Sequence, residues 1–352
     1  MVINKSSHIL VIRLSAMGDV AMTVPVILGL VKKYPEISIT VLTKAFTAPI
    51  FLDIPNVTVL IADVNGEHKG VLGLWKLSKQ LKRLEIDAVA DLHNVLRSSI
   101  LKQFLRFSSI PFIQLDKGRA VKKELIKRNR KNFSALKSTF VRYAEVFENL
   151  GFPITKQEMK TLSQKTFFKN ETTFSGFDES ELIGIAPFAA FSGKMYPLSL
   201  MENVIQELNN TDRYKIILFG GGEKEIAVLN KWEKLYTNCS NAAGKLSFAN
   251  ELVLISNLRL MLAMDSGNAH LASMYGVPTV TLWGVTHPYA GFYPFNQPES
   301  YGLLSDRNIF PAIPTSIYGN KYPEGYDNVM ETIKPETVVQ KIKEILELPI
   351  KG

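Results

Sequence analysis

Apolar runs of strand length alternate with stretches in which apolar residues recur at a helical period, and this alternation covers almost the whole chain. Such a pattern predicts an α/β protein whose parallel sheets carry helices on both faces. Strands of the first half are expected in the runs HILVIRL, ISITVLT, VTVLIA, IDAVADL and PFIQL. Helices are expected between them, at about 19–33, 69–84, 94–106 and 120–150.

The alternation restarts after a polar stretch, residues 156–180, that lacks a sustained period. Strands are then expected in LIGIAPF, YKIILFG, LRLMLAM and PTVTLWG, while residues 286–326 are expected to be mostly loop. A final amphipathic helix is predicted in KPETVVQKIKEILEL, with one apolar face made by Val338, Ile342, Ile345 and Leu346.

These patterns predict two doubly wound domains that face each other across a cleft, where the carboxyl ends of the strands bind ligands. The expected boundaries are a first domain at 1–165, a connection at 166–180, a second domain at 181–330 and a C-terminal helix at 331–352. Packing of this last helix back onto the first domain is one option. A length of 352 residues, 46% of them apolar, agrees with two cores.

The sequence predicts a cytoplasmic protein. It has no apolar run of the roughly 18 to 20 residues that span a bilayer, and its N-terminus leads into a strand pattern rather than a signal peptide. The single cysteine, Cys239, excludes an internal disulfide and a multi-cysteine metal site. No acidic cluster of metal-ligand type is evident either, so no metal is expected.

The net charge of +8 is concentrated in residues 117–137, which hold nine Lys or Arg and one acid, whereas the rest of the chain holds 32 of each sign. Such a run is either a solvated face or a site for an anionic partner. The partner would be a phosphorylated substrate with the membrane surface that displays it, or a nucleic acid. Phe133 is the segment's one aromatic residue, and no RNA-binding motif accompanies it, so no nucleic acid is expected.

The stretch RLSAMGDVAMTVP follows the first expected strand. A tight turn through Gly18 and a helix from about Asp19 would place backbone N–H groups at the carboxyl edge of the sheet, beside Ser15. Asp19 is either a helix cap or a general base that takes a proton from a hydroxyl. The stretch lacks the GxGxxG fingerprint, which argues against a nicotinamide site.

Three further motifs follow strands of the second half. Lys194, just ahead of a helix start, is either a surface lysine or a cation for phosphates. Asp265, Ser266 and Gly267 would form a phosphate cradle with His270, unless the aspartate only caps a helix and the histidine is structural. In LFGGGEKE, Glu223 or Glu225 could accept hydrogen bonds from a ribose.

In this order and at this separation, RLSAMGDVAMTVPV, KMYPL and AMDSGNAHLASMYGVPTVTLWG resemble the ADP-heptose:lipopolysaccharide heptosyltransferase family. The resemblance covers nearly the whole chain. It implies two Rossmann-like domains in the GT-B arrangement, with the acceptor on the first domain and the nucleotide sugar on the second. Asp19 then falls on the family's base, and Lys194 on its lysine, with Tyr196 in place of a tryptophan.

The same resemblance implies donor-diphosphate contacts from Asp265, Ser266, Gly267 and His270, and a ribose contact from Glu223, although Glu225 fits the spacing too. The chain departs from the family in having Ala16 after Ser15, and in having FAA at 188–190 where hydroxyl residues are common. These departures bear on the identity of the donor more than on the reaction class.

The implied enzyme is an inverting, metal-independent glycosyltransferase with no separate cofactor. It moves a sugar, a heptose from ADP-heptose in the family, to a hydroxyl of a lipopolysaccharide core. Residues 117–137 would hold the anionic acceptor, with peripheral association at the cytoplasmic face of the inner membrane. The alternatives are another nucleotide-sugar enzyme of this fold, such as an epimerase or a UDP-sugar transferase, and an anionic-lipid or nucleic-acid binding module.

Overall fold

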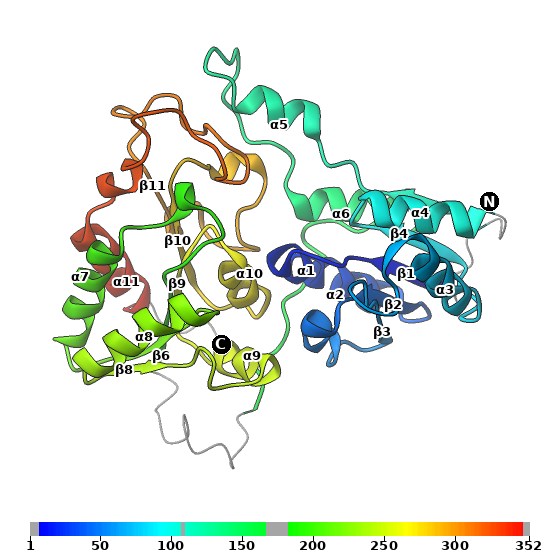
Figure 1. Ribbon diagram of the computed structural model, residues 1–352, viewed down its shortest axis with the longest axis horizontal. Helices are drawn as coiled ribbons and strands as arrows, with labels where there is room; N and C mark the ends of the chain where they lie inside the picture. The colour runs from blue at the N-terminus through cyan, green and yellow to red at the C-terminus, as the bar shows by residue number, and fades with distance from the viewer. Residues whose placement is uncertain (1–6, 107–109, 167–181, 348–352) are drawn as a thin grey trace. The chain divides into compact units, whose positions relative to one another are not determined.

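The computed structural model describes residues 7–106, 110–166 and 182–347 (Figure 1). The chain forms two compact units. The first comprises residues 1–119 and 137–162, and the second comprises 120–136 and 163–352. Most of the connection expected at 166–180 lies outside the described residues. The predicted first domain, 1–165, differs from the first unit mainly because residues 120–136 pack with the second unit.

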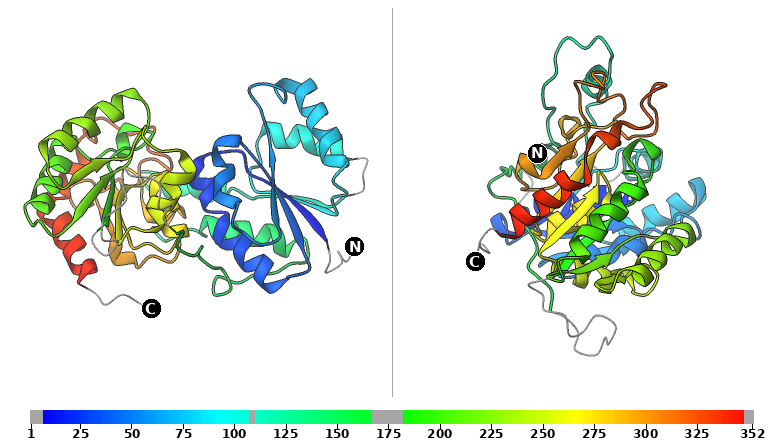
Figure 2. Two further views of the ribbon diagram at one scale, coloured as in Figure 1. Left: turned by 90° about the horizontal axis from the view of Figure 1, so that it is seen from below. Right: turned by 90° about the vertical axis from the view of Figure 1, so that its left-hand side faces the viewer.

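The first unit is built on a five-stranded parallel sheet in the order β3-β2-β1-β4-β5. Its strands are β1 (His8–Ile12), β2 (Ser38–Thr43), β3 (Val57–Ile61), β4 (Ala88–Asp91) and β5 (Phe112–Gln114). Its helices are α1 (Met17–Ala21), α2 (Val24–Lys33), α3 (Gly70–Lys82), α4 (Leu96–Leu105) and α6 (Thr139–Glu148), with the 3₁₀ helix η1 (Ala45–Phe51). Helices α3 and α4 pack together, as do α2 and α6 (Figures 1 and 2).

Two helices predicted in the first half are divided in the structure. The helix expected at 19–33 is α1 and α2, and Pro25 lies in the first turn of α2, where a missing N–H costs no hydrogen bond. The helical region expected at 120–150 is α5 (Arg119–Leu125) and α6. Residues 126–138 lack an apolar period, and their crowded positive charges disfavour a helix. The Ser138 hydroxyl accepts from the Val141 N–H at 3.3 Å, which caps the start of α6.

The second unit is built on a six-stranded parallel sheet in the order β11-β10-β9-β6-β7-β8. Its strands are β6 (Leu182–Ala186), β7 (Lys215–Leu218), β8 (Cys239–Asn241), β9 (Leu260–Met264), β10 (Thr279–Trp283) and β11 (Gly302–Leu304). Its helices include α7 (Leu198–Asn209), α8 (Glu223–Leu235), α9 (Phe248–Ser256), α10 (Gly267–Met274) and α11 (Pro335–Leu346). The predicted doubly wound, parallel-sheet class is confirmed for both units.

The C-terminal helix α11 belongs to the second unit, where it packs against α7. This placement corrects the option of packing on the first domain. The four residues of its predicted apolar face, Val338, Ile342, Ile345 and Leu346, are buried in the core of the second unit. Among the described residues, no helix combines the length and the apolar content needed to cross a bilayer.

Residues 120–136, here called the strap, leave the first unit and pack on the second. Arg130 donates hydrogen bonds to the carbonyls of Pro311, Ala312 and Ile313, at 3.1, 3.1 and 2.7 Å. The Phe133 ring lies 4.8 Å from that of Tyr289, between centroids. Part of the basic segment is therefore engaged in packing, because a guanidinium that donates to three carbonyls has few donors left for a ligand.

Candidate active site

The strand order of the first unit reverses between β1 and β4, and open α/β sheets commonly bind ligands at the loops that follow such a pair of strands. The β1 loop leads into α1, which begins at Met17 and carries Asp19 as its third residue. Gly18 is the second residue of α1 and has no positive φ, which corrects the expected tight turn. The Ala16 N–H donates to Asp19 Oδ2 at 3.4 Å, so the aspartate does cap its own helix.

Arg13 holds the Asp19 carboxylate. The distance from Arg13 Nη2 to Asp19 Oδ2 is 2.5 Å, and Arg13 Nη1 donates to the carbonyl of Leu92 at 2.6 Å, just after β4. The Tyr143 hydroxyl donates to the Asp19 carbonyl at 3.3 Å. Because a buried guanidinium needs an anionic partner, the pair fixes the orientation of the carboxylate. Both contacts described for this carboxylate are made by Oδ2, so Oδ1 is the oxygen left for a ligand.

His93 follows β4 and comes within 3.4 Å, from Nε2, of the Ser15 hydroxyl. Burial, with the positive charges of Arg13 and Lys117, lowers the pKa of His93 to about 4, so the imidazole is neutral at pH 7. Burial and the neighbouring Arg13 likewise lower the pKa of Lys117. Neither Arg13 nor His93 was predicted from the sequence. The sequence features that could have indicated them are an arginine at the end of the buried strand β1 and a histidine in the loop after β4.

In the second unit, the strand order reverses between β6 and β9, and the loops after these strands carry Lys194 and Asp265. Lys194 Nζ lies 3.2 Å from Asp265 Oδ2, and both side chains are almost buried. The Thr286 hydroxyl, after β10, donates to the same carboxylate oxygen at 2.9 Å. The structure thus brings together two residues that the sequence placed at separate strand ends.

Three glycines allow the Lys194 loop to sit where it does. The Val285 N–H donates to the Gly193 carbonyl at 2.9 Å, and a Cβ on Gly284 would lie 2.3 Å from that same oxygen. Gly319 has a φ of +81°, and a Cβ there would lie 2.3 Å from Lys194 Cγ. The stem of the lysine therefore rests on Gly319, which limits where its ammonium group can point.

Ser266 is the N-cap residue of α10, and its hydroxyl makes no capping hydrogen bond. The hydroxyl oxygen is buried and has no hydrogen-bond partner among the described residues. Gly267 opens the helix, and His270 is buried in its first turn. Together with Lys194 beside Asp265, these groups form a polar cluster of donors that suits an anion.

The two candidate ribose ligands differ in their surroundings. Glu225 Oε2 accepts from the Gly221 N–H at 2.8 Å, which ties it to the glycine-rich turn. Glu223 is the exposed first residue of α8, and no hydrogen bond or ion pair is described for it. Tyr196, at the family's tryptophan position, is fully buried and donates to the Ile333 carbonyl at 2.7 Å, so it serves packing.

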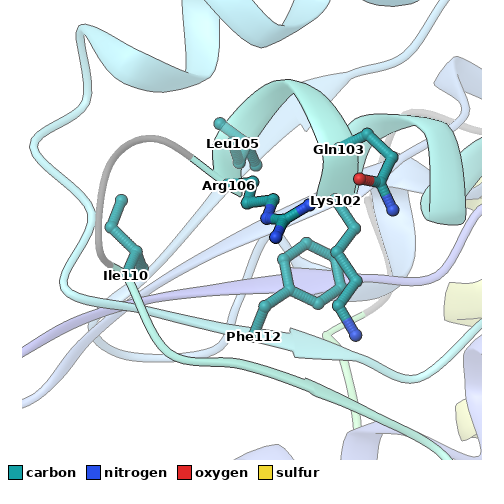
Figure 3. Close-up of a pocket in the computed structure, with 6 residues that line it drawn as sticks. All are labelled: Lys102, Gln103, Leu105, Arg106, Ile110 and Phe112. Atoms are coloured by element: carbon teal, nitrogen blue, oxygen red, sulfur yellow. The ribbon is translucent and has the colours of Figure 1, made fainter.

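A pocket of about 390 Å³ lies elsewhere in the first unit (Figure 3). Its walls come from the C-terminal part of α4 and the start of β5, so it lies at the edge of the sheet opposite to Asp19. In the described ranges, no group of three or more His, Cys, Asp or Glu side chains is placed to hold a metal ion.

Two solved structures share this fold over nearly their whole length. A family 9 glycosyltransferase from Veillonella parvula superposes with a TM-score of 0.76 at 20% identity, with 98% of each chain covered. The ADP-heptose lipopolysaccharide heptosyltransferase II of Escherichia coli gives a TM-score of 0.68 at 21% identity, covering 96% of this chain and 98% of that one. The fold is that of a GT-B glycosyltransferase.

Sequence comparison defines the family. Residues 74–301 match the model of glycosyltransferase family 9 (heptosyltransferase), and the chain belongs to this family. It is 26% identical over 343 residues to the lipopolysaccharide core heptosyltransferase OpsX of Haemophilus influenzae, covering 95% of this chain and 96% of the relative. The resemblance stated from the motifs is thereby confirmed, and the protein is a glycosyltransferase.

Proposed function

We propose that this glycosyltransferase moves a heptose from ADP-heptose to a hydroxyl of a lipopolysaccharide core. The donor and the acceptor are those in the names of its full-length relatives. The structural observation that carries the proposal is the cluster of Lys194, Asp265 and Ser266 at the switch point of the second sheet. It offers a cation and a buried hydroxyl for which the described part of the chain provides no hydrogen-bond partner. A nucleotide diphosphate needs donors of this kind.

In the proposed reaction, the acceptor oxygen forms a bond to the anomeric carbon as the bond to the diphosphate oxygen breaks, which inverts the configuration. Asp19 takes the proton of the attacking hydroxyl on Oδ1, since Oδ2 is held by Arg13. Lys194 stabilises the negative charge that grows on the leaving diphosphate, and the α10 N–H groups at Ser266 and Gly267 assist it. This arrangement supports a transfer without a metal ion.

The basic segment is proposed to hold the anionic acceptor, in a protein that works peripherally at the cytoplasmic face of the inner membrane. Support comes from Lys123, Arg128 and Lys131, which are among the exposed basic residues of the strap, and from Lys117, whose charge acts on His93. Arg130 is engaged with carbonyls and is excluded from this role. A lipopolysaccharide acceptor carries acidic groups, so its affinity should fall as salt screens them.

The proposal is tested by adding ADP-heptose and, separately, UDP sugars to the full chain. A ligand that binds the native state raises the melting temperature, by RT ln(1 + [L]/Kd) in free energy. ADP-heptose should raise the melting temperature and support transfer to a core acceptor, whereas UDP sugars should do neither. Stabilisation and transfer by a UDP sugar alone would favour the alternative transferase.

A further inference from the structure

The exposed side of α3 carries large apolar residues. Leu72 is 78% exposed and Trp75 is 45% exposed, and Val71 lies beside them on the first turn and a half of the helix. Leu96, the first residue of α4, is 77% exposed. The opposite side of α3 packs Leu74, Leu77 and Leu81 into the core of the first unit. The exposed apolar residues are therefore additional to the face that α3 uses for packing.

The charges that α3 and α4 themselves carry have one sign. Residues 69–83 hold five Lys or Arg and no acid, and α4 adds Arg97 and Lys102, also without an acid. The ammonium of Lys79 lies over the Trp75 ring, 3.5 Å from its centroid. Lysine is depleted at protein interfaces, whereas an apolar strip with tryptophan and flanking lysines is typical of helices that lie in the headgroup region of an anionic bilayer.

The position of this surface in the first unit also fits a membrane. Helix α3 follows β3 and α4 follows β4, so Leu72 and Leu96 both lie toward the carboxyl edge of the sheet. Asp19 follows β1 at the same edge. A bilayer that contacts this rim would therefore present the head group of a lipid on the side of the sheet where Asp19 lies.

We propose that the exposed face of α3, with the first turn of α4, docks on anionic lipid. This face is separate from the basic segment 117–137. The proposal adds a membrane contact to the function proposed above. That this contact brings the protein to a membrane-bound acceptor rests on that proposed function. Leu72, Trp75 and Leu96 enter the headgroup region, while Lys76 and Lys79 contact lipid phosphates.

The three tryptophans make a direct test possible. Trp232 and Trp283 are each 1% exposed, so a change in tryptophan emission on vesicle binding reports mainly on Trp75. The full chain is mixed with vesicles of phosphatidylcholine alone or with phosphatidylglycerol added. We expect a blue shift and co-sedimentation with the anionic vesicles, both weakened by 0.5 M salt, and neither with phosphatidylcholine alone.

Variants localise the contact. Leu72→Ser and Lys76→Glu should each lower the affinity for anionic vesicles by about fivefold or more. The matched controls, Leu235→Ser and Lys234→Glu at exposed positions of α8, should bind as the unaltered protein does. Unchanged melting temperatures in all four variants confirm that they are folded.

The outcomes separate this proposal from the enzymatic one. Transfer to a deacylated, water-soluble core acceptor should be unchanged in Leu72→Ser and Lys76→Glu. If that transfer occurs but anionic vesicles alter neither emission nor sedimentation, the docking proposal is overturned and the function stands. The docking proposal would also be overturned if Leu72→Ser and Lys76→Glu both bound anionic vesicles as tightly as the unaltered protein does. A doubled molar mass in light scattering that Leu72→Ser abolishes without any vesicle binding would overturn it too, because the surface would then bind a second copy.

Discussion

Lys194 and Asp265 pair with each other, Nζ to Oδ2 at 3.2 Å, across two loops that leave adjacent strands. A cation that would act on a diphosphate is therefore already neutralised by a carboxylate of the protein. Thr286 holds the same carboxylate oxygen from a third loop. A bound anion must therefore either displace Asp265 from Lys194 or share the lysine with it. Until an anion binds, Asp265 keeps the ammonium group of Lys194 in place.

Substitution of Lys194 by Met should lower turnover by about 10² to 10³, because one group that stabilises the leaving charge is removed. Steady-state kinetics with varied donor concentration provides the measurement. Lys231→Met serves as the control, since the contact described for Lys231 is an exposed ion pair with Glu202, at 3.6 Å. Equal turnover in the two variants would remove Lys194 from the mechanism.

Asp19→Asn should lower transfer by at least about 10²-fold, because the amide cannot accept the proton of the acceptor hydroxyl. Donor binding, followed by the rise in melting temperature with ADP-heptose, should persist. Both Asp19→Asn and Asp19→Ala remove the counter-charge of the buried Arg13. The amide, however, preserves the shape of the side chain and keeps an oxygen that can accept a hydrogen bond from Arg13, whereas alanine keeps neither. A fully active Asp19→Asn enzyme would contradict the assignment of a base.

Gly319→Ala should reduce turnover more than Gly325→Ala does. Both glycines have a positive φ, +81° and +79°, so both substitutions carry a similar backbone strain of about 1 kcal/mol. A Cβ on Gly319 would press on Lys194 Cγ, however, whereas nothing lies within 4 Å of a Cβ on Gly325. The ratio of the two kcat values measures the effect of moving the lysine. A ratio near one would show that its stem is free to shift.

Arg130→Ala should destabilise the second unit by about 2 to 3 kcal/mol, because three carbonyls lose a charged donor. Arg128→Ala, at an exposed position two residues away, should change stability by no more than about 0.5 kcal/mol. Urea unfolding measures both free energies. The affinity for the acceptor should instead fall more in Arg128→Ala than in Arg130→Ala, because Arg128 is the residue proposed to contact the anion. A larger loss of acceptor affinity in Arg130→Ala would contradict the division of roles within the basic segment.

The unaltered protein should lose stability relative to His93→Gln as the pH falls from about 6.5 to about 4. The pKa of His93 is lowered to about 4 in the folded chain, so within this window the unfolded state binds the proton and the folded state does not. Glu251 acts in the opposite direction, because burial raises its pKa to about 7, but it contributes equally to both proteins. Unfolding free energies at several pH values give the difference, which should be constant above pH 7.

Much of the fold was predictable because buried parallel strands are continuous apolar runs. Two strands were missed, β8 (CSN) and β11 (GLL), since three residues at a sheet edge need no apolar run. The break between α1 and α2 was missed because Pro25 is compatible with a first helical turn as well as with a helix end.

The sequence predicted those residues of the candidate site that directly follow a strand. Lys194, Asp265 and Ser266 each follow a strand, and the reversal of strand order brings them together. The partners that fix the other predicted residues come from far along the chain. Ser15 reaches His93, 78 residues away, and Arg13, which holds Asp19, is itself anchored on the Leu92 carbonyl, 79 residues away, so these contacts depend on the fold rather than on a local pattern.

The strap has a consequence for dividing the molecule. The chain passes between the units near residues 119, 136 and 162, so no single cut separates them. A fragment that ends at residue 165 would keep Leu125 and Phe133 but lose their apolar neighbours Ile317 and Tyr289. Its complement would keep the bare carbonyls of residues 311–313. The two fragments should therefore aggregate when each is expressed alone, because each exposes apolar or polar groups that the other covers. Co-expression of the two fragments should restore the solubility of both.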